Sequence, residues 1–236
     1  MKTITKLSLL LVFAAASRME AAFESAQFDP ANVLPAFPSG LQIQGITRGD
    51  VFVALGVTAE GRVSDSLVLG YTQESLATAV RGVVNQWRFA PARLDGAPVP
   101  AQFTMRVAFT LQGAVVSGDI VNHFFFDNFE RMGDGYLRYR LHAADEIDRV
   151  PGRVNTVAPK YARQAEQEGV RGRVRVYFYI DEEGRVRLPA VDSELQPYLT
   201  EQAVAAVREW RFEPPTRGGQ PVLIAASEEF DFSSAK

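Results

Sequence analysis

The chain has 236 residues, of which 47% are hydrophobic and 22% charged, and this composition excludes a wholly disordered or fibrous protein. Its net charge is −3. Without the first 22 residues, which hold three basic and one acidic side chain, 22 basic face 27 acidic side chains, a net charge of −5. A nucleic-acid-binding protein carries a basic excess, so we expect no nucleic-acid partner. The absence of cysteine excludes disulfides, thiol catalysis and cysteine-bound metals.

The N-terminus has the pattern of a signal peptide, which we place at residues 1–22. Lys2 and Lys6 precede a largely apolar run over residues 7–16. Ten residues span about 15 Å as a helix, against about 30 Å for a hydrocarbon core, so the run is too short for a stable membrane anchor. We therefore expect export and a soluble mature protein, whose only membrane contact would be an uncleaved N-terminus.

An internal repeat organises the rest of the chain. The pentapeptide Trp-Arg-Phe-Ala-Pro at 87–91 returns as Trp-Arg-Phe-Glu-Pro at 210–214, 123 positions later. The same offset holds without a gap from residue 49 to residue 109 of the first copy. We therefore predict two homologous domains at 27–112 and 151–236, joined by a connecting segment at 113–150.

The first copy predicts a strand, a turn, a second strand, a helix and a last strand, in that order. Apolar residues alternate over 51–57, as in a half-buried strand, and a glycine turn and a strand at about 62–68 follow. A helical apolar face runs over 76–87, and Pro91 prevents its continuation. The last strand alternates over 99–111. Residues 37–40, Phe-Pro-Ser-Gly, form a poor helix before the first strand.

The connecting segment is too apolar at 123–129 for a flexible linker, so we expect it to pack against a domain or to pair as an irregular strand. Asp145, Glu146 and Asp148 form a short acidic stretch, which we interpret as a solvated approach to the second domain.

The second copy repeats the first, with strands at 174–180, 185–191 and 222–232 and a helical face at 199–210. It also has the pattern of a short helix at about 159–168, ended by Gly169. Each copy is thus an α+β domain with a three-stranded antiparallel sheet and one or two helices packed on one face. We expect the two tryptophans to anchor the two cores, and Arg88 and Arg211 to stabilise the helix ends through the helix dipole.

Residues that could carry enzymatic chemistry are few. His123 and His142 lie in the connecting segment, and the chain has no zinc-protease, serine-hydrolase or nucleotide-binding motif. Residues 181–183, Asp-Glu-Glu, lie at a hairpin turn with too few ligands for calcium. We predict no catalytic residue, no metal site and no cofactor.

The combined pattern of both copies resembles the TonB C-terminal domain. The resemblance rests on five motifs: Pro-x-aromatic, Gly-x-Val-x-Val, Trp-Arg-Phe-x-Pro, Gly-x-Pro-Val and a terminal Phe-x-Phe strand. The second copy departs from the family in having Ala162 where a proline belongs, and a tandem pair is unlike the best-known members. The motif residues are Pro35, Phe37, Pro38, Trp87, Arg88, Phe89, Pro91, Pro159, Tyr161, Trp210, Arg211, Phe212 and Pro214.

The resemblance implies a periplasmic, non-enzymatic protein of a Gram-negative-type envelope. Its partners would be envelope proteins or extended peptides, including a TonB-dependent outer-membrane transporter, bound by strand addition at the last strand. Two alternatives stay open. One is a membrane-anchored TonB-type energy transducer, and the other is a structural or cell-wall-binding module, or an assembly platform that dimerises through its own edge strands.

The two terminal strands differ in the chain segments that come after them. The aromatic segment at 122–129 comes after the first copy's strand, so it can cover that edge. The second copy's strand ends four residues before the C-terminus, and Glu228 and Glu229 interrupt its apolar pattern. We therefore predict that the second copy accepts the partner. The predicted contact residues are Ile224, Ala225, Ala226, Ser227, Glu228, Glu229, Phe230, Asp231 and Phe232.

Overall fold

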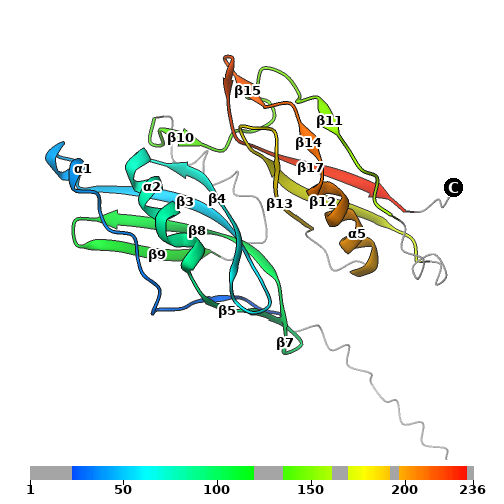
Figure 1. Ribbon diagram of the computed structural model, residues 1–236, viewed down its shortest axis with the longest axis horizontal. Coiled ribbons are helices and arrows are strands. Elements are labelled where there is room, and N and C mark those ends of the chain that lie inside the picture. Colours follow the sequence, from blue (N-terminus) through cyan, green and yellow to red (C-terminus); the bar gives the residue numbers. More distant parts are fainter. Residues whose placement is uncertain (1–22, 120–134, 161–169, 192–196, 233–236) are drawn as a thin grey trace, which may run out of the picture.

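The structure, a computed structural model, describes residues 23–119, 135–160, 170–191 and 197–232. In these residues the chain forms two α+β units, one from each copy of the repeat (Figure 1). The predicted signal peptide, the aromatic segment at 122–129, Tyr161 and most of the helix at 159–168 lie outside the described residues.

The first unit contains the predicted antiparallel three-stranded sheet. Its strands have the spatial order β4-β3-β8, so the first strand is central, and α2 follows β4 with a single 3-10 turn, η1, after it. The bounds are β3 Arg48–Val57, β4 Val63–Tyr71, α2 Glu74–Val83, η1 Val84–Gln86 and β8 Ala101–Thr110.

Two further strands from the connecting segment extend this sheet to five, in the order β10-β4-β3-β8-β9. β9 (Gly113–Asp119) returns along β8, and β10 (Tyr139–Arg140) pairs with the end of β4. Residues 113–119 and 139–140 are therefore part of the first unit's sheet.

The second unit has the predicted three-stranded sheet, which within the described residues has the order β13-β12-β17. β12 pairs with β17 along its whole length. The bounds are β12 Arg173–Ile180, β13 Val186–Val191, α5 Pro197–Arg208 and β17 Ile224–Asp231.

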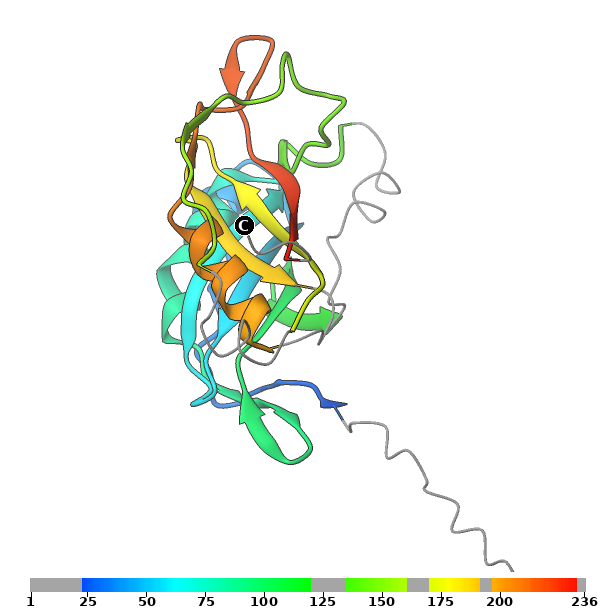
Figure 2. The same cartoon turned by 90° about the vertical axis from the view of Figure 1, so that its right-hand side faces the viewer.

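Short pairings complete both units. In each, a strand before the sheet pairs with the residues that follow the tryptophan: β2 (Gln27–Phe28) with β5 (Phe89–Ala90), and β11 (Arg153–Asn155) with β14 (Arg211–Phe212). The remaining strands are β1 Phe23–Glu24, β6 Ala92–Leu94, β7 Ala97–Val99, β15 Thr216–Arg217 and β16 Gln220–Pro221. Figure 2 shows the β6–β7 hairpin and the β15–β16 hairpin at opposite ends of the molecule.

α2 and α5 each cover one face of their own sheet, and each helps to bury a separate core. The core of the first unit centres on Trp87 and the core of the second on Trp210, which are 1% and 2% exposed. Both helices face the viewer in Figure 1. The tryptophans are thus core residues, as expected. None of the described helices combines the length and apolarity that a membrane span requires.

The two sheets meet through the faces turned away from the helices. A third cluster of buried side chains joins them, with four residues from each unit and Leu141 from the connecting segment between them. Its members are Phe52, Ala54, Leu67, Leu69, Leu141, Tyr179, Leu188, Leu223 and Ala225.

Polar contacts surround this third cluster. The Arg187 guanidinium donates to the Asp65 carboxylate, with Nε 3.1 Å from Oδ2, and to the Ser66 carbonyl at 2.9 Å. Gln102 Nε2 donates to the Pro189 carbonyl at 3.0 Å. The two copies therefore form one joined body.

One short helix differs from the sequence prediction. Residues 37–40 form a poor helix by propensity, yet α1 (Ser39–Ile43) begins immediately after Pro38. Leu41 is 5% exposed and packs in the first core, so burial of this side chain compensates for the weak propensity of Ser39 and Gly40. Gly45, at φ 74°, follows the helix and donates its N–H to the Gln42 carbonyl.

Candidate partner-binding edge

The strand β17 forms one margin of the second sheet. On one side it pairs with β12 from Arg173↔Asp231 to Ile224↔Ile180. On its other side, within the described residues, the recorded pairing is a single parallel bridge between His142 and Ile224, in which His142 N–H donates to the Leu223 carbonyl at 2.9 Å. The predicted contact strand is therefore a sheet edge, covered at its first residue.

The backbone groups that point outward follow from the pairing. Phe232 N–H donates inward to the Gly172 carbonyl at 2.8 Å, whereas the Leu223 carbonyl accepts from His142 on the outer side. Because inward and outward groups alternate along an antiparallel strand, the N–H and C=O groups of Ala225, Ser227 and Glu229 point outward. Ser227 and Glu229 are exposed. Ala225 is buried and lies beside the parallel bridge to His142, so the groups of Ser227 and Glu229 are the ones that can add one further strand to the sheet.

The side chains of β17 alternate between two environments. Ala226, Phe230 and the adjacent Phe232 pack against the core under α5, and the Phe230 ring centroid lies 5.7 Å from that of Trp210. Ala225 faces the first unit in the third cluster. Ile224, Ala225 and Phe232 are buried, so the accessible part of the predicted contact is 226–231.

Ion pairs order the charged side chains beside the edge. Glu228 accepts from Arg153 at 2.7 Å, and the Arg153 guanidinium lies over the Trp210 ring, 5.1 Å from its centroid. Glu229 pairs with Arg175 at 2.9 Å and with Arg173 at 3.7 Å. Because these pairs are largely exposed, each contributes at most about 1 kcal/mol, so their role is to orient side chains along the edge.

The equivalent edge of the first unit is already occupied. β9 pairs with β8 over Thr104↔Asp119 to Thr110↔Gly113. From the sequence we expected residues 122–129 to cover the edge of β8. In the structure residues 113–119 pair with that edge. The two terminal strands are thus unequal, because one edge carries a strand of the same chain.

The same hydrogen bonds anchor the helix end in both units. Trp87 Nε1–H donates to the Val33 carbonyl at 2.9 Å and Trp210 Nε1–H to the Val157 carbonyl at 2.8 Å. Arg88 and Arg211 donate to the carbonyl of the preceding tryptophan at 3.1 and 2.9 Å, a placement that fits the expected interaction with the helix end.

The other motif residues support these two anchors. Phe89 and Phe212 are buried in the two cores, and Phe37 lies against the first core with its ring 6.4 Å from Phe109. Pro35 is buried, Pro38, Pro91 and Pro159 are partly buried, and Pro214 is exposed.

Of the acidic residues of the connecting segment, Asp145 and Asp148 are exposed, as in a solvated approach, whereas Glu146 is partly buried. Glu146 pairs with Arg140 and accepts the Ala143 N–H at 2.9 Å, and the Arg140 hydrogen bonds lower its pKa to about 2. Asp148 accepts the N–H groups of Gly219 and Gly218 at 2.9 and 2.7 Å, which lowers its pKa. Both carboxylates fix the path of the chain between the units.

The turn carboxylate Asp181 and His142 both have structural contacts in the fold. Asp181 is 1% exposed and accepts from Arg185 N and Nε, each at 2.8 Å, so it closes the β12–β13 turn. No group of three or more metal-ligating side chains occurs in the part of the chain that the structure describes. The pKa of His142 is lowered, first by burial and then by Arg140.

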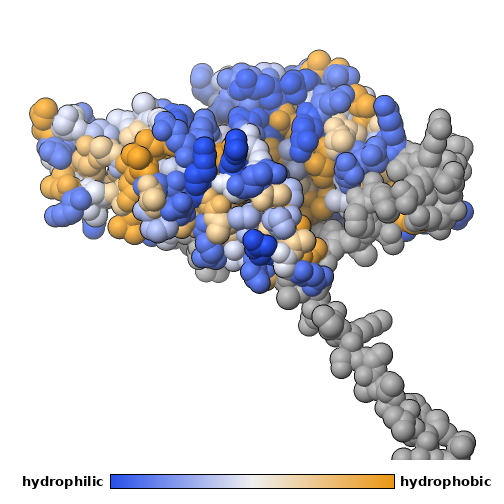
Figure 3. All heavy atoms as spheres, turned by 60° about the horizontal axis from the view of Figure 1, so that its bottom comes forward, coloured by the Kyte–Doolittle hydropathy of each residue, from blue (hydrophilic) through white to orange (hydrophobic). Residues whose placement is uncertain are grey.

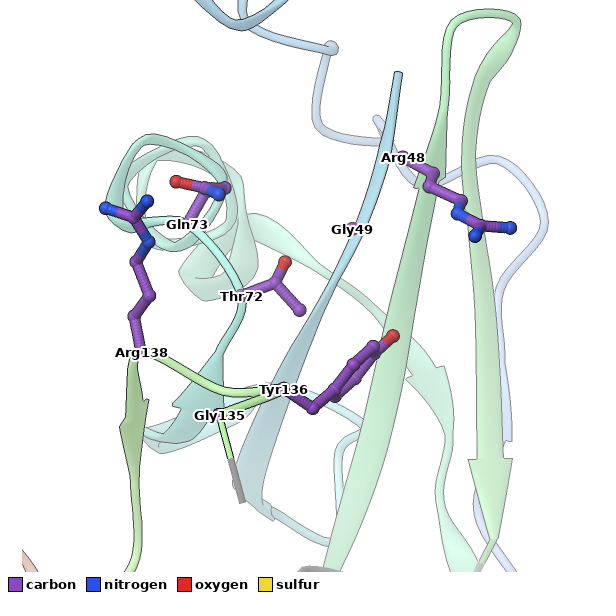
Figure 4. A pocket seen from close by; sticks show the side chains of 7 residues that line it. All are labelled: Arg48, Gly49, Thr72, Gln73, Gly135, Tyr136 and Arg138. Atoms are coloured by element: carbon purple, nitrogen blue, oxygen red, sulfur yellow. The ribbon is translucent and has the colours of Figure 1, made fainter. Parts of the chain in front are cut away.

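A pocket of about 320 Å³ lies at the start of α2, between the first sheet and residues 135–138. Figure 4 shows Arg48 and Arg138 on opposite sides of it, with their guanidinium groups turned away from each other, and Thr72 between them. It therefore lacks convergent polar groups for one small ligand. On the face drawn in Figure 3, hydrophobic residues lie in separate groups among hydrophilic ones. The sheet edge is the better candidate site.

Comparison with known proteins decides the family. A family model described as the Gram-negative bacterial TonB protein C-terminal matches residues 34–111 and again 157–233. The chain belongs to this family. The tandem pair of TonB C-terminal-like domains inferred from the sequence is confirmed, and so is the α+β fold of two small repeats.

A protein sequence and a solved structure, both from Pseudomonas aeruginosa, are similar to this TonB C-terminal tandem. Protein TonB is 38% identical over 82 residues, which make up 33% of this chain and 23% of that protein. A solution NMR structure of the TonB CTD has 30% sequence identity and a TM-score of 0.34, and the match covers 41% of this chain and 96% of that chain. The matched region is thus less than a quarter of the curated relative.

Proposed function

We propose that this TonB C-terminal tandem is a periplasmic, non-enzymatic protein that binds extended peptides or envelope partner proteins by strand addition at β17. Its role is linked to TonB-dependent outer-membrane transport, with a transporter of that class as partner. The observation that supports it is the outward N–H and C=O groups of Ser227 and Glu229, on an edge whose equivalent in the first unit already carries a strand.

Strand addition suits this edge physically. Main-chain hydrogen bonds to β17 supply affinity, and the alternating side chains of the added strand supply specificity. An edge with two closely spaced glutamates also resists unspecific pairing between copies, because charged edge residues discourage it. The first unit, whose edge is closed by β9, serves as a rigid support for the second.

Substitution at Glu229 tests the proposal. Glu229→Pro removes one outward N–H without removing a bond to β12, so the domain stays folded and binding is lost. Glu229→Ala removes the same ion pairs with Arg173 and Arg175 but keeps the N–H. In pull-downs from an outer-membrane extract, we expect the wild type and Glu229→Ala to capture a TonB-dependent transporter, and Glu229→Pro to capture none. Equal capture by a folded Glu229→Pro variant contradicts the proposal.

A further inference from the structure

The connecting segment passes from the first unit to the second at His142. The residue before it, Leu141, donates its N–H to the Leu69 carbonyl of β4 at 2.6 Å, and His142 donates its own N–H to the Leu223 carbonyl at 2.9 Å. Two successive amides therefore bond to different units. We call residues 139–148, which pair with β4 at one end and with the β15–β16 hairpin at the other, the junction segment.

The imidazole of His142 is enclosed at this junction with one polar atom unsatisfied. Its side chain is 12% exposed, and Nδ1 is the one buried side-chain nitrogen or oxygen atom of the described residues that has no hydrogen-bond partner. The Glu146 carboxylate lies 3.6 Å from Nδ1, beyond hydrogen-bonding distance. Burial without a partner costs free energy for a neutral ring, and it costs far more for a charged one.

The charges around the imidazole also oppose its protonation. Among the described residues, the charged groups that act on it are Arg140 and Glu146 of the junction segment and Arg217 of the β15–β16 hairpin. Glu146 is the one anion in this set, and it already pairs with Arg140 and accepts the Ala143 N–H. A protonated ring would be a third cation beside a single carboxylate. Burial first, and then Arg140, therefore lower the pKa of His142 below its ordinary value of 6.5.

From this arrangement we propose that His142 makes the junction between the two units sensitive to acid: protonation of its imidazole opens the junction segment at the His142–Leu223 hydrogen bond, while the two helix-side cores stay folded. The segment is closed while the ring is neutral, above about pH 6.5. It opens as the pH falls below that value, because the open state binds the proton more tightly than the closed state. The inference is independent of the strand-binding function proposed above and adds a conformational response to pH.

Amide hydrogen exchange followed by NMR tests the opening. Between about pH 7.5 and about pH 5, the protection factors of the Leu141 and His142 amides, corrected for the intrinsic effect of pH on exchange, should fall at least about threefold. Each unit by which the pKa of the closed state is lowered allows up to about a tenfold change in the opening equilibrium. The amides of Val53 in β3 and Val176 in β12, the central strands of the two sheets, should keep their protection.

Three substitutions assign the effect to the imidazole. His142→Gln keeps the backbone N–H but has no titrating ring, so its protection factors should stay constant over this pH range. Arg217→Gln keeps the ring and removes one nearby cation, so the fall should be smaller than in the wild type. This second variant tests the inference even if glutamine at position 142 disturbs the junction segment. His123→Gln, the matched change at the other histidine of the chain, should behave as the wild type.

Titration of the imidazole resonances checks the cause directly. In the His123→Gln variant, His142 is the single histidine, so its NMR signals are unambiguous. Its titration midpoint should lie below 6.5. Adding Arg217→Gln should raise this midpoint and adding Glu146→Gln should lower it further, since the two side chains act on the pKa of the ring in opposite directions.

Three results would overturn the inference. One is a titration midpoint of His142 at or above 6.5. Another is an equal loss of protection in the wild type and in His142→Gln. The third is a loss that Val53 and Val176 share, because it would show unfolding of the whole molecule and not opening of the junction segment. None of these measurements involves a partner protein, so each outcome leaves the proposed function to its own test.

Discussion

At the scale of residues, the two units repeat the same contacts with different side chains. The Asp50–Arg106 pair, 2.8 Å apart, links β3 to β8, and its counterpart 123 positions later is Arg173–Glu229 with the charges exchanged. Gly61 and Gly184 both have a φ of 76°. A Cβ atom on either would meet the carbonyl oxygen of Phe89 or Phe212. The turn and the helix end are therefore held together by backbone contacts, which explains why Gly and Trp-Arg-Phe recur as one pattern.

The close approach at Gly184 gives a prediction for stability. Gly184→Ala should lower the free energy of unfolding by about 2 kcal/mol or more, because it adds left-handed strain to a clash with the backbone of Phe212. Gly82→Ala, in α2 with no atom within 4 Å of the added Cβ, should leave stability unchanged or raise it by up to about 1 kcal/mol. Urea unfolding followed by tryptophan fluorescence measures both. Equal effects of the two substitutions would refute the structural role of the turn.

At the scale of elements, the sequence predicts what each copy contains and misses what lies between the copies. Hydrophobic periodicity placed β3, β4, α2, β12, β13, α5 and β17 within a few residues, because each buries one face against its own core. It described the strand at 51–57 as half-buried, whereas residues 49–57 are all buried. Phe52 and Ala54, on the second face, were a sequence signal for a second packing surface.

Other features could not be predicted from the sequence because they depend on contacts between residues far apart in the chain. β9 carries the pattern Ala-Val-Val-Ser-Gly, which has no partner until β8 exists beside it, so its pairing was not evident locally. The partners of Glu146 and Asp148, which are Arg140 and the N–H groups of Gly218 and Gly219, could not be read from the sequence because the fold brings them together. The difference between the edges of β8 and β17, in contrast, could be predicted from the order of segments along the chain.

The connecting element gives a prediction for the pH dependence of stability. The pKa of Glu146 is about 2 in the folded protein, against 4.5 as its ordinary value. Stabilisation by this carboxylate is therefore complete above about pH 4.5 and is lost as the pH falls toward 2. Glu146→Gln should flatten this acid limb in unfolding measured between pH 2 and 6. Glu74→Gln, which breaks the exposed pair with Arg81 on α2, should leave the limb as in the wild type.

At the scale of the whole molecule, the two units share one interface made of their remaining sheet faces. Leu69, Leu141 and Leu223 are each at most 2% exposed, so these interface side chains are buried as deeply as those of the helix-side cores. The Tyr139 hydroxyl donates to Glu182 while its ring stacks on Tyr71 at 5.0 Å, so the connecting segment itself spans the interface. A strand bound at β17 would therefore be held by both units together, because their shared interface joins them.

Coupling between the units can be measured because each core holds one of the two tryptophans. Trp87→Phe leaves Trp210 to report on the second unit, and Trp210→Phe leaves Trp87 to report on the first. Within each variant we expect the midpoint from tryptophan fluorescence, which reports on one unit, to equal the midpoint from far-UV circular dichroism, which reports on both, since interface burial makes unfolding of one unit expose the other.

Leu69→Asp should separate the two midpoints, because a charge buried in the interface is relieved by opening it, while the core under α2 stays intact. Leu76→Ala, on α2 and away from the interface, removes a fully buried side chain of the first core at a cost of about 2–5 kcal/mol. It should shift both midpoints together. Separate midpoints in the parent proteins, or coincident and unshifted midpoints after Leu69→Asp, would show that the units are independent.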